Sequence, residues 1–97
     1  MALTFIAEIN LKPDCFDVAC RAVGEIVAAT RDEAGCERFD AHPMADGSST
    51  LMIYERWANR AAYDFHHAQD YTRAVFKSYE DWLSGPVKMT ELADGLV

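Results

Sequence analysis

Two adjacent histidines, His66 and His67, are the side chains in this sequence best suited to moving protons near neutral pH. They fall in a stretch whose apolar positions have helical spacing, and Ala62 and Phe65 mark the side expected to be buried. Neighbours on a helix point about 100° apart, so we expect only one of the pair to face a given pocket. His66 lies nearer to the buried side and is the candidate acid or base. The alternative is a histidine whose ring is simply satisfied by a backbone carbonyl.

Glu55 is the second candidate, because it falls on the apolar face of a predicted strand. Alternation places it on the same face as Ile53 and Trp57. A carboxylate on such a face is costly unless it is paired, and burial would raise its pKa and suit it to act as a base. The alternative is a structural partner for Arg56, Arg60 or a backbone amide.

Other kinds of site find little support in the sequence. It contains no phosphate-binding loop, no G-x-S-x-G elbow, no H-E-x-x-H pair and no dinucleotide fingerprint. A metal site would need one of the paired histidines together with Asp40, His42 or Glu55, and none of these has ligand spacing. We therefore predict no metal site.

Composition and charge narrow the class of protein. The chain has 97 residues, 51% of them hydrophobic, which suits a single packed domain over residues 1–97. Its net charge of −7 argues against nucleic acid and anionic membranes as partners. The start, MALTFIAEI, has no basic region, and no apolar run reaches membrane-spanning length. Three cysteines without a C-x-x-C pair fit a reduced protein, so we expect a cytoplasmic domain.

The first third of the chain predicts a strand followed by a helix. Apolar residues alternate over residues 3–11, which indicates a strand with one apolar face. Helical spacing then runs from Phe16 to about residue 34, with Asp14 as the expected N-cap. Gly24 is expected to allow a close approach to the sheet, and Gly35 to adopt the left-handed conformation after the helix.

The rest of the chain predicts a hairpin, two helical segments and a last strand. These are strands over 36–44 and 49–57, a helical segment capped by Asn59, a helix over 70–83 and a strand over 87–92. Gly47 supplies the positive φ of the hairpin turn. The order βαββαβ is that of a ferredoxin-like α+β fold, with a four-stranded antiparallel sheet covered by helices on one face.

The sheet face opposite the helices should not be open to water. It carries Ile6, Met52 and Tyr54 among its polar groups, which makes it too apolar for a free surface. A second sheet packed against it is the simplest cover, so we expect a homodimer.

Three segments of the chain carry a family resemblance. They read E-A-G-C-E-R-F-D at 33–40, L-M-I-Y-E-R-W-A-N-R-A-A-Y-D-F-H at 51–66 and A-Q-D-Y at 68–71. The pattern has a Glu-Gly-Cys-like turn before the second strand, an E-x-W at the end of the third, and a histidine eleven residues after that glutamate. In these features, over nearly its whole length, the sequence resembles the antibiotic-biosynthesis-monooxygenase family.

The resemblance implies a dimeric α/β barrel with a pocket for a small-molecule substrate between sheet and helices. Some members oxidise quinols or polyketide aromatics with molecular oxygen and without metal or flavin, so no cofactor is expected. His66 matches the family's histidine and Glu55 its glutamate, which implies catalytic roles for both. The substrate-binding residues expected on the same basis are Ile9, Asn10, Phe39, Tyr54, Trp57 and Tyr71.

Two other functions stay open. The chain is also similar to isomerases of phosphorylated autoinducer-2, in which His66 would move a proton and Arg56 or Lys88 would meet the phosphate. A non-catalytic module that binds a small ligand is the third possibility. Haem degradation is not expected, because the positions of the haem-degrading relatives' Asn, Trp and axial His hold Ile9, His66 and Phe76 here.

Overall fold

Four strands form one antiparallel sheet in the computed structural model, which describes residues 2–96. Met1 and Val97, the ends of the predicted domain 1–97, lie outside the described residues. The strands are β1 (Leu3–Asn10), β2 (Cys36–Pro43), β3 (Thr50–Trp57) and β4 (Lys88–Leu92), in the spatial order β2-β3-β1-β4. All three pairings are antiparallel, which confirms the predicted sheet.

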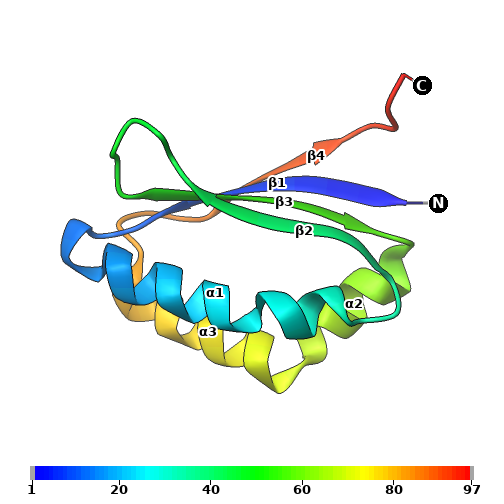
Figure 1. Ribbon diagram of the computed structural model, residues 1–97, viewed down its shortest axis with the longest axis horizontal. Coiled ribbons are helices and arrows are strands. Elements are labelled where there is room, and N and C mark those ends of the chain that lie inside the picture. The colour runs from blue at the N-terminus through cyan, green and yellow to red at the C-terminus, as the bar shows by residue number, and fades with distance from the viewer. Residues whose placement is uncertain (1, 97) are drawn as a thin grey trace.

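Three helices cover one face of this sheet, and the opposite face carries none in the described chain (Figure 1). They are α1 (Phe16–Arg31), α2 (Arg60–Ala68) and α3 (Asp70–Trp82), and a 3-10 turn, η1 (Pro13–Cys15), precedes α1. This arrangement confirms the ferredoxin-like α+β fold. Within residues 2–96, no helix has the length and apolar character needed to cross a membrane.

Asn59 caps the start of α2 as predicted, since its side-chain oxygen accepts a hydrogen bond from the Ala62 amide at 2.9 Å.

The core lies between the sheet and the helices, where alternate strand residues meet the inner faces of α1 and α3. The buried apolar residues are Phe5, Ala7, Ile9, Leu11, Ala19, Val23, Phe39, Leu51, Ile53, Trp57 and Tyr79.

The predicted ends of α1 were wrong. Its N-cap residue is Cys15, and no side chain caps it, because the turn Pro13–Cys15 leads the chain into the helix in place of the expected Asp14 cap. The helix ends at Arg31 and leaves Glu33 in a turn before β2. Because Glu33 lies beyond the end of the helix, its side chain is not held on the helix surface, and it is buried.

Gly47 has the positive φ that the hairpin prediction required, at 79°.

Gly35 does not adopt the predicted left-handed conformation, since Gly47 is the residue with positive φ in the part of the chain described. The role of Gly35 is instead to allow a close contact. A Cβ atom on Gly35 would collide with the Cβ of Ala62 in α2, and the Gly35 carbonyl accepts a hydrogen bond from the Ala58 amide at 2.8 Å. Glycine therefore lets the segment that carries Glu33 lie directly against α2.

Two other predictions about packing were wrong. Phe65 is 54% exposed, because α2 turns His66 rather than Phe65 toward the core. Gly24 is not a point of close approach, since a Cβ atom there would meet nothing within 4 Å.

The two glycines give a matched pair of substitutions. Gly35→Ala should destabilise the protein by about 1–3 kcal/mol, because the new methyl group must push α2 away. Gly24→Ala should stabilise it by about 0.5–1 kcal/mol, since alanine restricts the unfolded chain and α1 has room for it. Urea unfolding of both variants and wild type gives the two free energies. A Gly35→Ala protein as stable as wild type would show that the close contact is not tight.

Candidate active site

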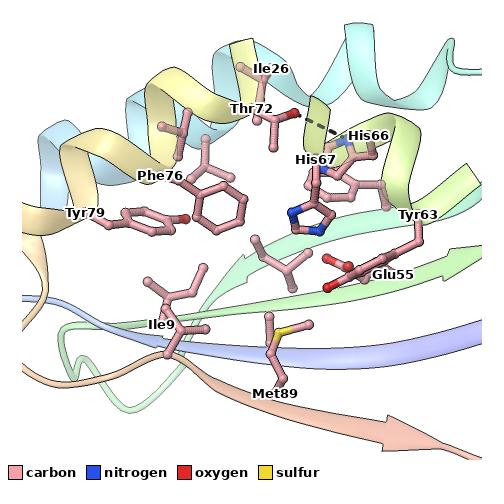
Figure 2. A pocket seen from close by; sticks show the side chains of 16 residues that line it. Ile9, Ile26, Glu55, Tyr63, His66, His67, Thr72, Phe76, Tyr79 and Met89 are labelled. Carbon is pink, nitrogen blue, oxygen red and sulfur yellow. Dashed lines mark hydrogen bonds between the residues drawn. The ribbon is translucent and has the colours of Figure 1, made fainter. Parts of the chain in front are cut away.

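A cavity of about 230 Å³ lies between the sheet and the helices (Figure 2). Ile9 and Met89 reach it from the sheet, and Phe76 and Tyr79 reach it from α3. Most of its wall is apolar, and none of the lysines or arginines among residues 2–96 lines it. Its polar side chains are Glu55, Tyr63, His66, His67, Thr72 and Tyr79.

His66 in the cavity wall is bound to a buried carboxylate. Its Nδ1 lies 2.8 Å from Oε2 of Glu33, and the two side chains are only 5% and 4% exposed. The Tyr71 hydroxyl donates to the same oxygen, and Thr72 Oγ1 lies 3.4 Å from Nδ1. Because a carboxylate oxygen accepts, Nδ1 carries the proton of the neutral ring, which leaves a lone pair on Nε2. The predicted alternative, a histidine bound by a backbone carbonyl, was wrong.

Aromatic rings hold the His66 imidazole in one orientation. The Trp57 ring stacks on it with centroids 4.6 Å apart and planes 28° apart, and the Phe39 ring lies at 5.6 Å. With Glu33 on one edge and Trp57 on one face, the imidazole has little freedom to turn. A lone pair held in a fixed direction is what a general base requires.

Glu55 lies on the apolar face of β3, as predicted, and is buried in the cavity wall. Burial raises the pKa of its carboxyl group, and the hydrogen bond from Trp57 and the nearby His66 oppose this only partly. Its partner is the Trp57 indole, whose Nε1 donates to Oε1 at 3.1 Å. The predicted arginine partners were wrong, since Arg56 and Arg60 bind exposed carboxylates elsewhere.

The prediction that only one of the two histidines can face the pocket was also wrong. Both rings line the cavity, with centroids 5.3 Å apart and planes at 80°. The cavity is lined by residues of both α2 and α3, so it extends around more than one side of α2. Side chains about 100° apart on that helix therefore enter it from two sides.

The structure places the six predicted substrate-binding residues in three different environments. Ile9 and Phe39 line the cavity. Trp57 and Tyr71 lie behind it and hold the polar groups, Trp57 through Glu55 and Tyr71 through Glu33.

The other two, Asn10 and Tyr54, point to the helix-free face of the sheet, because they alternate with the buried residues of their strands. Thr50 Oγ1 donates to Asn10 Oδ1 at 2.9 Å, and the Arg38 guanidinium lies 5.9 Å from the Tyr54 ring centroid. The structure does not bring these two residues to the cavity.

Glu33 is the residue of the candidate site that the sequence did not reveal. It stands in the E-A-G-C segment, which the sequence marks as a turn, and its neighbours Asp32 and Ala34 form no apolar pattern that would indicate burial. Had the helix been predicted to end at Arg31, Glu33 would have fallen outside it, and its side chain could then have been expected to turn inward. No group of three or more His, Cys, Asp or Glu residues that could hold a metal ion occurs among the residues described.

Known proteins share this sequence pattern and this fold. The sequence profile of the family described as antibiotic biosynthesis monooxygenase matches residues 2–78. A curated protein of Mycobacterium tuberculosis named "Putative monooxygenase Rv0793" is 30% identical over 88 residues, which are 91% of this chain and 86% of that protein.

Solved structures agree with this comparison. The structure of Rv0793 has a TM-score of 0.90 at 27% identity and covers 100% of both chains. The structure of PA3566 from Pseudomonas aeruginosa has a TM-score of 0.89 at 29% identity and covers 96% of this chain and 93% of that one.

Burial of Glu55 predicts a pH dependence of stability. Its pKa is raised in the folded protein, so its favourable contribution is complete below the unfolded pKa and is lost as the pH rises through the folded pKa. Wild type should therefore lose stability relative to Glu55→Gln as the pH rises from about 4 toward neutrality. Urea unfolding across that range measures the difference. Glu25→Gln, at an exposed position of α1, is the control, and a Glu55→Gln profile parallel to wild type would contradict the assignment.

Proposed function

Because the chain belongs to the antibiotic biosynthesis monooxygenase family, we propose that it is a cofactor-independent monooxygenase for a small aromatic hydroxyl compound, such as a quinol or a polyketide phenol. The observation that carries the proposal is the Glu33–His66 pair in the wall of an apolar cavity. The name of the Mycobacterium tuberculosis relative supports oxygen chemistry in general. The proposed substrate class rests on the family resemblance and on the mostly apolar lining of the cavity.

His66 begins the reaction by taking the hydroxyl proton of the substrate on Nε2. Glu33 supports this step, because it holds the Nδ1 proton and stabilises the imidazolium that forms. The apolar wall removes water from the resulting anion, which favours transfer of its electrons to oxygen. The substrate itself thus supplies the electrons.

Oxygen then forms a bond to a ring carbon of the anion, and the resulting peroxide takes the proton from His66. Loss of the hydrogen on that carbon breaks the O–O bond and leaves a carbonyl group. Glu55 in its protonated form, which its raised pKa favours, gives a proton to the departing hydroxide and recovers one from the carbon. The substrate loses two hydrogen atoms and gains one oxygen atom, and the second oxygen atom leaves as water.

The isomerase alternative is less well supported, because the cavity offers no cation for a phosphate. Arg56 donates to Glu37 and to Thr4 away from the cavity. Lys88 is exposed, and alternation along β4 turns it away from the cavity that its neighbour Met89 lines. A phosphorylated substrate would therefore enter an uncharged, apolar wall at a large desolvation cost.

We further propose that two copies of the chain pair through the helix-free face of the sheet. Ile6, Met52 and Tyr54 on that face are only partly buried in the single chain. They lie side by side, since Ile6 pairs with Tyr54 and neighbouring Glu8 pairs with Met52 in the β1–β3 register. A second sheet packed there would bury these side chains and give a dimeric α/β barrel.

Oxygen consumption tests the proposed activity. Wild type should accelerate oxygen uptake by 1,4-naphthohydroquinone or anthrone above the spontaneous rate, and His66→Ala should reduce that acceleration by roughly 10²–10⁴-fold. Lys77→Ala is the control, because that side chain is exposed on α3 and does not line the cavity. Equal rates for the two variants, or no uptake above background by wild type with either compound, would contradict a monooxygenase of this class.

Light scattering tests the dimer. At micromolar concentration the wild-type mass should be twice the 10.9 kDa of one chain. Met52→Glu should give the monomer mass, since it would place a buried charge at the centre of the proposed interface. Met44→Glu changes an exposed methionine in the hairpin loop and should leave the dimer intact. A wild-type mass of 10.9 kDa would disprove the pairing.

A further inference from the structure

The second histidine of the cavity has no role in the chemistry above, and one of its nitrogen atoms lacks a partner. Nε2 of His67 is buried and makes no hydrogen bond to any of the residues described. The ring itself is held firmly: its centroid lies 4.3 Å from that of Tyr63 and 5.2 Å from that of Phe76, whose plane is within 17° of its own. Figure 2 shows the ring at the cavity between these two aromatic side chains.

A buried polar atom without a partner destabilises the protein, because it has lost its hydrogen bond to water and gained none in return. Because the His67 side chain is part of the cavity wall, a molecule bound in the cavity can supply the missing partner. We propose that His67 is a specificity-determining residue that binds an oxygen atom of the ligand through Nε2. It acts at a different point of the cavity from His66, since the two rings lie 5.3 Å apart and nearly at right angles.

A neutral imidazole suits this role. Burial, and next the neighbouring His66, lower the pKa of His67 more than Asp64 and Glu33 raise it, which favours the uncharged ring. In the uncharged ring, Nε2 accepts a hydrogen bond in one tautomer and donates one in the other. His67 can therefore meet a hydroxyl group in a reduced ligand and a carbonyl group in its oxidised form.

The consequence concerns the class of ligand. Resting on the proposed function, the inference is that the preferred ligand carries two oxygen substituents, one for His66 and one for His67. An aromatic compound without oxygen would leave Nε2 of His67 buried and unpaired, and the cavity should discriminate against it.

Ligand binding measured by calorimetry without oxygen tests this inference. The probes are 1,4-naphthoquinone, which has two carbonyl groups, and naphthalene, which has the same two rings and no oxygen. The His67→Phe substitution keeps a ring between Tyr63 and Phe76 and removes both nitrogen atoms. It should weaken binding of 1,4-naphthoquinone by about 3–10-fold and change that of naphthalene by less than about 2-fold.

His67→Gln guards against a general loss of structure, because its amide can restore a hydrogen bond and should recover part of the affinity for 1,4-naphthoquinone. Equal effects of His67→Phe on the two probes, unchanged affinity for the quinone, or no binding of the quinone by wild type would each overturn the inference. No turnover occurs in this experiment, so a selective loss in His67→Phe would stand even if oxygen uptake failed to appear.

Discussion

The buried contact between Glu33 and His66 is the interaction on which the rest of the site depends. Burying a carboxylate is costly, and here the cost is met by two donors on Oε2, the imidazole of His66 and the hydroxyl of Tyr71. Oε1 has no partner among residues 2–96, so the carboxylate is not fully satisfied. Removing the donor of such a buried hydrogen bond typically costs about 1–3 kcal/mol, and more where the group left behind is charged. The contact is also what gives His66 a defined tautomer.

The fold brings this contact about through a few close approaches. Gly35 lets the turn after α1 lie against α2, and so places the carboxylate of Glu33 next to the ring of His66. Trp57 joins the two candidate proton-transfer groups, because its ring stacks on His66 and its Nε1 donates to Glu55. The tryptophan is fully buried at the end of β3, so both groups take their positions from the core.

The sequence alone was enough to predict the elements, the sheet, and the inward positions of Glu55 and His66. Alternation predicted the buried residues of β3, including Glu55, and most of those of β1, because a period of two leaves few alternatives; Thr4 is buried on the other face. Glu33 was missed because its burial depends on a long-range contact with α2 that has no periodic signal. His67 was misplaced for a similar reason, since the width of the cavity depends on how α2 and α3 are placed together.

The proposed base role of His66 depends on which ring nitrogen carries its proton, and nitrogen-15 NMR of the imidazole measures this directly. Because Nδ1 faces the carboxylate of Glu33, the neutral ring in the resting protein should carry its proton on Nδ1 and none on Nε2. The Glu33→Gln variant should lose this preference, because its amide no longer requires a donor on Nδ1. A neutral wild-type ring with its proton on Nε2 would contradict the proposed mechanism, since His66 could then take no proton from a substrate.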